Sequence, residues 1–159
     1  MKLTTLMTRA FLTTAVAAAT LLPAFASQKN FKADRVTVES SKPFADVAGA
    51  VKKMVAGNGM MVMAEVDQGK MLSMTGLKLE AKLFLIGNPN VGKKLFQRNK
   101  AVGLYVPLRI FVHSDGHGKT FISYDKPSSL LDQFGDNNIK KVGGMLDQKL
   151  AGLAQMAAK

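Results

Sequence analysis

The sequence predicts an α+β domain, in which helices pack on one face of an antiparallel sheet of about five strands. Three observations lead to this class. Short segments alternate apolar and polar residues, as half-buried strands do. Residues 44–55 and 139–156 instead repeat apolar side chains at helical spacing. The run at 114–118, Ser-Asp-Gly-His-Gly, is typical of a hairpin turn. With small helical inserts set aside, the expected order is β-α-β-β-β-β-α.

The expected strands follow from alternating or apolar runs bounded by Gly, Pro, Asn and Asp. They are Lys29–Ser40, Met60–Val66, Lys82–Ile86, Ala101–His113 and Lys119–Tyr124. In the second, Met61, Met63 and Glu65 should face one way, and Met60, Val62, Ala64 and Val66 the other. The third is the most apolar and is expected at the centre of the sheet. Pro107 lacks a donor, so the fourth should have an edge or a bulge there.

The expected helices begin at capping residues or prolines and end at glycines. The first helix should start at Pro43, with Ser41 or Lys42 as its cap, and end at Gly57. Further helices are expected at Lys70–Thr75, Pro89–Arg98, Pro127–Phe134 and after Asp136. In the last of these, one stripe should hold Ile139, Val142, Met145, Leu146, Leu150, Leu153 and Met156.

The first 26 residues predict an export signal that is no part of this fold. Lys2 and Arg9 form a positive start, residues 10–22 are apolar, and residues 24–26 read Ala-Phe-Ala, a typical cleavage site. The apolar run is short of the roughly 20 residues that span a bilayer. We therefore expect a periplasmic or secreted mature chain, residues 27–159, that forms one domain without a transmembrane segment. An uncleaved N-terminal anchor is the alternative.

The composition limits the chemistry and favours anionic partners. The chain has no cysteine, which excludes thiol catalysis and thiolate metal sites. Of its 22 basic residues, 20 lie beyond residue 26 against 11 acidic ones. No acidic residue lies between Glu80 and Asp115, a stretch that contains Lys82, Lys93, Lys94, Arg98, Lys100 and Arg109. Such a field attracts anions, although a solvated basic face is the simpler reading. The aromatic residues are not interleaved for stacking, so nucleic acid is not expected.

The run Gly87-Asn88-Pro89-Asn90-Val91-Gly92-Lys93-Lys94 comes close to the phosphate-binding loop of nucleotide triphosphatases. In that loop a Ser or Thr hydroxyl binds Mg²⁺ at the position where this chain has Lys94. A second ammonium group there would repel the metal. The sequence also lacks an Asn-Lys-x-Asp motif for reading the base. We therefore do not expect an NTPase.

The same run resembles a different family. Gly87-Asn88-Pro89, Gly92 and then Pro107-Leu108-Arg109, followed by Asp115, Tyr124 and Pro127, are similar to the DUF302 family. The resemblance covers roughly Pro43 to Gly135. It implies a small α+β domain of the TATA-binding-protein-like class, and it supplies no ligand or reaction. Where the family often has Asp-His-Ala, this chain has Asp67-Gln68, so a role for that histidine does not carry over.

No set of residues predicts a catalytic mechanism, a cofactor or a strong metal site. His113, Asp115 and His117 flank a tight turn, and a surface turn is the simpler interpretation than a metal site. The sequence has no Ser-His-acid or paired-carboxylate pattern. Methionines do cluster, and thioethers suit Cu(I), but methionine also fills irregular cores. The Cu(I) candidates are Met60, Met61, Met63, Met71 and Met74.

Three hypotheses follow. The first is an exported, non-enzymatic module that binds a small anionic or amphipathic ligand at Gly87, Asn88, Pro89, Gly92, Lys93 and Arg109. There Asn88 would offer its amide, free N–H groups at a helix start would face the ligand, and Arg109 would offer its planar fork. Alternatively, Asn88-Pro89 only caps a helix. The second is a periplasmic Cu(I) carrier that uses the methionines. The third is an assembly role, with a sheet edge near Pro107 pairing in a homodimer.

Overall fold

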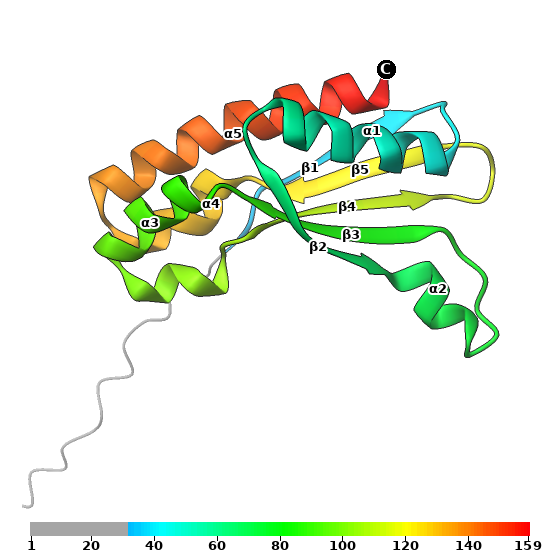
Figure 1. Ribbon diagram of the computed structural model, residues 1–159, viewed down its shortest axis with the longest axis horizontal. Coiled ribbons are helices and arrows are strands. Elements are labelled where there is room, and N and C mark those ends of the chain that lie inside the picture. The colour runs from blue at the N-terminus through cyan, green and yellow to red at the C-terminus, as the bar shows by residue number, and fades with distance from the viewer. Residues whose placement is uncertain (1–31) are drawn as a thin grey trace, which may run out of the picture. The chain divides into compact units, whose positions relative to one another are not determined.

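The structure is a computed structural model that describes residues 32–159 (Figure 1). The predicted export signal lies outside these residues. The five strands are β1 (Arg35–Ser40), β2 (Met61–Asp67), β3 (Ala81–Gly87), β4 (Leu108–Ser114) and β5 (Thr120–Asp125). The α-helices are α1 (Phe44–Gly57), α2 (Gln68–Ser73), α3 (Pro89–Arg98), α4 (Pro127–Leu131) and α5 (Asn137–Ala158). The 3₁₀ helices are η1 (Lys100–Leu104) and η2 (Asp132–Phe134). Without the small helices, the order is the predicted β-α-β-β-β-β-α.

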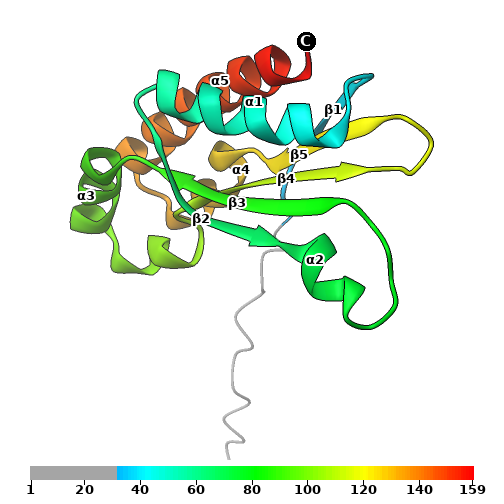
Figure 2. The same cartoon turned by 45° about the vertical axis from the view of Figure 1, so that its right-hand side comes forward.

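All five strands form one antiparallel sheet in the order β1-β5-β4-β3-β2. The strand expected at the centre, β3, is an inner strand, and β4 holds the central position (Figure 2). The edges are therefore β1 and β2, so the prediction of a sheet edge near Pro107 is wrong. Pro107 comes just before β4 begins, where its missing N–H costs the ladder no hydrogen bond. The homodimer hypothesis loses the edge on which it was built.

Residues 101–107 do not belong to the fourth strand, contrary to expectation. Asn99 turns the chain after α3, and its side-chain oxygen accepts the Ala101 N–H at 2.9 Å. That cap starts η1, and the strand begins only at Leu108. The start of α1 also differs from expectation, because Pro43 stands at the cap position without a side-chain hydrogen bond. The nearby hydroxyl of Ser40 instead accepts from Lys42 N–H and donates to the Ala158 carbonyl.

A bulge in β2 breaks the alternation expected for that strand. Val62 pairs with Ile86, but the next paired residue is Ala64, opposite Leu85. The extra residue is Met63. Beyond it Glu65, rather than Ala64, lies on the helix-covered face, where it contacts Lys52 of α1 at 3.1 Å.

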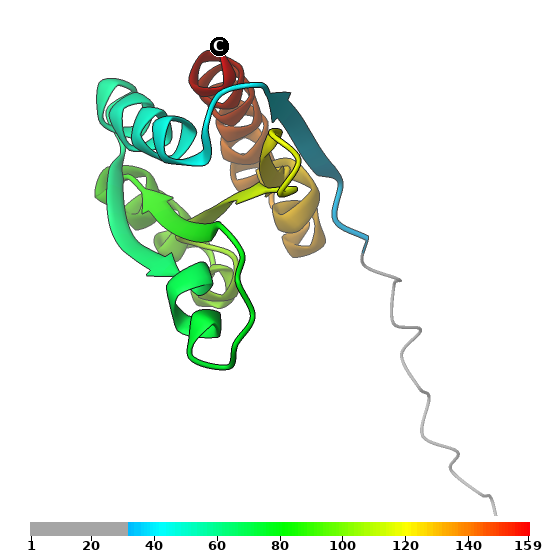
Figure 3. The ribbon, with the colours of Figure 1, turned by 90° about the vertical axis from the view of Figure 1, so that its right-hand side faces the viewer.

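The main core lies between one face of the sheet and helices α1 and α5 (Figure 3). Its fully buried members come from α1, the inner strands and α5: Val47, Val51, Val55, Phe84, Ile86, Ile110, Val112, Ile122, Leu150 and Leu153. Two members of the predicted α5 stripe, Met145 and Met156, are instead about half exposed. Small residues, among them Gly143, Ala154 and Ala157, take up that packing surface. No helix within residues 32–159 is long and apolar enough to cross a bilayer.

A second, smaller core lies under the end of the molecule that carries α3. Leu95, Val102, Leu131 and Ile139 are buried there, one each from α3, η1, α4 and α5. Gly143 lets α5 approach α4, because a Cβ at that position would lie 2.9 Å from the Ser128 Cα. This second core fixes α3 relative to the sheet and so positions the candidate site.

Candidate functional site

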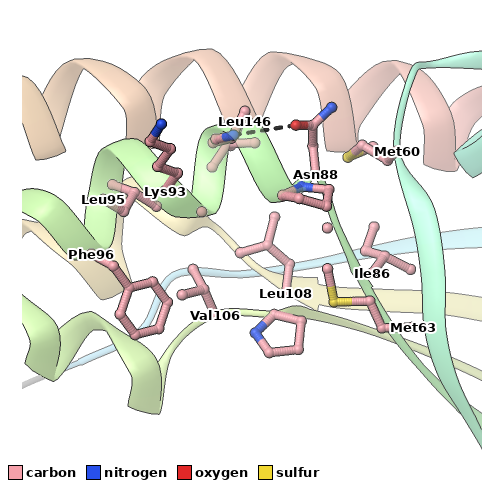
Figure 4. A pocket seen from close by; sticks show the side chains of 15 residues that line it. Met60, Met63, Ile86, Asn88, Lys93, Leu95, Phe96, Val106, Leu108 and Leu146 are labelled. Carbon is pink, nitrogen blue, oxygen red and sulfur yellow. Dashed lines mark hydrogen bonds between the residues drawn. The ribbon is translucent and has the colours of Figure 1, made fainter.

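A cavity of about 330 Å³ lies where β3 leads into α3. Figure 4 shows α3 on one side of it and the segment before β4 on the other. The predicted residues Gly87, Asn88, Pro89, Gly92 and Lys93 all line it. The remaining lining residues are apolar: Met60, Met63, Ile86, Val91, Leu95, Phe96, Val106, Pro107, Leu108 and Leu146. The cavity is thus an apolar space with a few polar groups, as small-molecule sites commonly are.

The side chain of Asn88 makes three hydrogen bonds that hold the site together. Its oxygen accepts from the N–H groups of Asn90 and Val91, at 2.8 and 3.2 Å. Its amide nitrogen donates to the carbonyl of Gly59 at 2.7 Å, which ties α3 to the turn between α1 and β2. The cap alternative is therefore what the structure shows. Asn88 shapes the cavity wall, with its oxygen and one of its two amide N–H groups bonded within the chain.

Residues 89–92 of α3 do not offer free N–H groups, contrary to the expectation for an anion site. Pro89 has no N–H, and Asn88 accepts from the next two. The Gly92 N–H donates to the Asn88 carbonyl at 2.9 Å. The donors of residues 90–92 thus have partners within the chain. A side chain is therefore the better candidate to hold an anion near this cavity.

Lys93 is the charged side chain at the cavity. Of the described residues that line it, Lys93 alone carries a charge, and it forms no ion pair with a residue that the structure describes. It is exposed, so its ammonium group can move in solvent near the opening. The opening also includes Met63 and Phe96, which are 48 and 45% exposed. An apolar interior with one cation at the edge suits a molecule with an apolar body and an anionic end.

The two glycines of the motif leave room for different reasons. At Gly87 a Cβ would lie 3.0 Å from the Cε of Met63, so the missing side chain allows close approach. Its backbone is not in the left-handed region. At Gly92 a Cβ would meet no heavy atom within 4 Å. Gly92 therefore borders empty cavity space from inside a helix, where a side chain could be added without a clash.

Arg109 does not belong to this cavity. It lies on β4 between Leu108 and Ile110, which both face the core, so it points to the opposite face of the sheet. There it borders a separate hollow of about 470 Å³ with Arg35, His113 and Asp125. The sequence motif that joins Arg109 to Asn88 thus places them on two different surfaces.

The basic residues between Glu80 and Asp115 also differ in whether they form ion pairs. Lys82 contacts Glu65 at 2.6 Å and Asp67 at 3.5 Å, and Arg98 contacts Asp136 at 2.7 Å. The hydrogen bond from Lys82 lowers the pKa of Glu65, and the one from Arg98 lowers the pKa of Asp136. Lys93, Lys94 and Lys100 have no such partner among residues 32–159.

The five methionine candidates do not form one cluster. Met60 and Met63 line the cavity, while Met61 is half exposed. Met71 and Met74 belong to α2 and the loop after it, at the other end of β2 (Figures 1 and 2). Only Met60 and Met63 are therefore brought to the same site.

The two histidines occupy unlike surroundings. The ring of His113 stacks between Phe111 and Phe121, at centroid distances of 5.0 and 5.3 Å. His117 is exposed at the hairpin, where its N–H donates to Asp115 Oδ1. Among residues 32–159 no group of three His, Cys, Asp or Glu side chains is placed to hold a metal ion.

Sequence reasoning found one wall of the cavity and missed the other. The missed residues are Ile86, Val91, Leu95, Phe96, Val106, Pro107, Leu108 and Leu146. Pro107 and Leu108 belong to the same motif as Arg109. The motif therefore identified the correct segment, but the residue chosen from it, Arg109, does not line the cavity. Leu146 lies in α5, and no local pattern links it to this site.

Fold and cavity together define a class of protein: a single-sheet α+β domain with an apolar cavity at one end. The family model described as "Domain of unknown function DUF302" matches residues 36–157, and this chain belongs to that family. A solved structure, an uncharacterized conserved DUF302 protein from Bacillus stearothermophilus, has the same fold, with a TM-score of 0.71. That similarity covers 79% of this chain and 98% of the other at 20% sequence identity.

The chain is also similar to part of two longer proteins. Proteins from Brucella suis biovar 1 (strain 1330) and Brucella abortus biovar 1 (strain 9-941), both named fluoride-specific ion channel FluC 1, are 34% identical over 96 residues. The match takes in 60% of this chain and 38 and 36% of those proteins. The chain thus spans little more than a third of their length.

Proposed function

We propose that this chain is an exported, non-enzymatic module that binds a small amphipathic molecule with an anionic end. The apolar body would occupy the cavity beneath α3, and the anionic end would lie near Lys93. The cavity carries this proposal, because an apolar space of about 330 Å³ falls within the range of small-ligand pockets. Export is proposed from the sequence of residues 1–26 alone. The channel activity named for the Brucella proteins is not part of the proposal.

Blocking the cavity tests this binding site. Leucine in place of Gly92 would project into the open space and should also favour the helix. We expect wild-type protein to bind decanoate in a calorimetric titration below its micelle threshold, and Gly92→Leu to lose this binding. Gly152→Leu is the matched control, because Gly152 also lies inside a helix with no atom within 4 Å of its Cβ position. Equal binding by wild type and Gly92→Leu would remove the cavity as the site.

A second titration separates the charged end of the ligand from its apolar body. Lys93→Gln should weaken the binding of decanoate by up to about fivefold, because exposed ion pairs contribute little. It should leave the affinity for decanol unchanged. Weakening of both ligands alike would show that Lys93 acts through packing rather than charge.

Native mass spectrometry of the protein from its own host tests ligand and export together. A mature chain that begins at Ser27 would support export with cleavage, and residue 1 at its start would contradict cleavage and favour the uncleaved anchor. An organic mass that is lost on denaturation would identify the ligand.

A Cu(I) carrier is a second candidate, favoured by one observation: Met60 and Met63 line the same cavity. Thioethers are soft ligands that suit Cu(I). Titration against a copper(I) competitor should then show uptake by wild type and none by Met60→Leu/Met63→Leu. Leucine keeps nearly the same volume, so this variant should fold. Equal uptake by both would exclude these two methionines.

A further inference from the structure

We propose that the surface formed by α3 and η1 docks on anionic lipid bilayers, with the cavity opening within the docked surface. We call it the α3–η1 surface and define it by Lys93, Phe96, Leu104 and two flanking lysines, Lys94 and Lys100. The inference goes beyond ligand binding, since it names a partner surface. It does not depend on whether the cavity holds a ligand.

Exposed apolar side chains are the first observation. Leu104 is 81% exposed, and Phe96 is 45% exposed. The two belong to one surface, because η1 packs on α3 and a Cβ at Gly103 would lie 3.3 Å from the Phe96 ring. Figure 4 shows Phe96 at the edge of the cavity, on the side where η1 lies. Exposed apolar side chains that lie together, unlike single ones, can mark a surface that a partner or a membrane covers.

The charge around these side chains is the second observation. Lys93, Lys94 and Lys100 form no ion pair within residues 32–159, whereas Lys52, Lys82 and Lys119 all do. No acidic residue lies between Glu80 and Asp115 along the chain. The groove between α3 and α5 adds Arg98 and Lys141 beside Lys94. Arg98 is paired with Asp136, so that acid is already neutralised.

Unpaired lysines around exposed Phe and Leu are the combination that binds a membrane interface. The apolar side chains enter the headgroup boundary, and the lysines attract anionic lipid. A docked α3–η1 surface would place Met63 and Phe96, and so the cavity opening, against the lipid. An amphipathic ligand could then pass between bilayer and cavity without crossing water.

The loop after α2 is a rival surface with different chemistry. Met71, Met74 and Leu77 are exposed there to 55, 83 and 51%. Charges of both signs surround them, because Asp67 caps α2 and the neighbouring hollow is lined by Lys70 and Lys78 as well as by Glu80 and Asp115. That surface offers apolar contacts without a net attraction to anionic lipid, so charge favours the α3–η1 surface.

Vesicle co-sedimentation tests the proposal. Protein expressed with its own leader, with its N-terminus read by intact mass, is mixed with vesicles of phosphatidylcholine alone or of equal parts phosphatidylcholine and phosphatidylglycerol. We expect binding to the anionic vesicles only, weakened by added salt. Lys93→Gln/Lys94→Gln/Lys100→Gln should lower the partition coefficient by about fivefold per lysine at low salt. Leu104→Ser should lower it as well.

Matched controls decide between this surface and general stickiness. Lys42→Gln/Lys53→Gln/Lys78→Gln removes the same charge from exposed, unpaired lysines elsewhere, and Met74→Ser removes an apolar side chain of nearly equal exposure to Leu104. These variants should bind nearly as wild type does. Equal losses in control and test variants, larger losses in the controls, or no binding to anionic vesicles would each overturn the proposal. Gly92→Leu should still bind vesicles, so failure of the cavity proposal would be seen separately.

Discussion

The α3 end and the α2 end of the sheet expose similar side chains but differ in what lies beneath them. Both have a short helix capped by a side chain, Asn88 for α3 and Asp67 for α2, and both expose large apolar residues. Under α3 there is an apolar cavity of about 330 Å³. Beside α2 there is a larger hollow of about 560 Å³, but charged side chains such as Lys70 and Glu80 line it. The backbone there is tight at one point, since a Cβ at Gly69 would lie 2.4 Å from the Leu79 carbonyl oxygen. Exposure and volume therefore do not by themselves identify a site for an apolar molecule; an apolar lining does.

The largest expected effect is the contrast between the two glycines. Gly69→Ala forces a methyl group against backbone and should destabilise the protein by about 1–3 kcal/mol. Gly92→Ala meets no atom within 4 Å and should stabilise it by about 0.5–1 kcal/mol, through lower backbone entropy in the unfolded chain. Urea unfolding of both variants measures the difference. Similar stability changes of the same sign would mean that the two ends are packed alike.

The two helix-cap substitutions should differ less in their effect on stability than the two glycine substitutions do. Asn88→Ala removes a helix cap, worth about 0.5–2 kcal/mol, and also the bond to Gly59 that holds α3 to the next layer. Asp67→Ala removes only the cap of a peripheral helix and an exposed contact with Lys82. Asn88→Asp is the control, because it keeps the cap oxygen but cannot donate to Gly59.

Hydrogen-exchange protection of the two helices would locate each loss. We expect Asn88→Ala to lower protection in α3 and in the turn that holds Gly59, and Asp67→Ala to lower it in α2 alone. If Asn88→Ala lowers protection in α3 only, the hydrogen bond to Gly59 does not stabilise that turn.

The smallest expected effect is on the stability of the protein at low pH. The hydrogen bond with Arg98 lowers the pKa of Asp136, and the bond from the Lys70 N–H lowers that of Asp67, both below an ordinary value of 3.8. A lowered pKa adds stability that is fully present above 3.8 and is lost as pH falls through the folded-state value. Asp136→Asn and Asp67→Asn keep a cap oxygen but cannot titrate there. Below pH 3.8 the Tm of each variant should therefore fall less steeply with pH than that of the wild type. An unchanged slope of Tm against pH would contradict the lowered pKa of that aspartate.

Local chemistry allowed much of the fold to be predicted. Asn88-Pro89 starts α3, Asp136 caps α5, and Gly135 ends η2 with a φ of 63°. Each feature depends on a few neighbouring residues, so its pattern is visible in the sequence. The predictions failed where contacts between residues far apart in the chain determine the structure. The bulge at Met63 reversed the faces of β2, and the central place of β4 removed the expected edge at Pro107.

The candidate site divides in the same way. Residues 87–93 were identified from one motif, and all five of its predicted members line the cavity. Arg109 was assigned to the same site by order in the chain, but strand alternation turns it to the opposite face. Leu146 comes to the cavity from α5 and carries no motif at all. The apolar character of the site could not be read from a stretch rich in lysine.

By itself the sequence determined the element order, the capped start of α3 and the absence of acidic residues around it, because these depend on short-range pattern and composition. Only the tertiary structure decided that Lys82 and Arg98 form ion pairs while Lys93, Lys94 and Lys100 form none within residues 32–159. It also decided that Asn88 is occupied and that an apolar cavity lies behind it. Partners and empty space arise where segments distant in the chain meet, and sheet order and helix packing choose which segments those are.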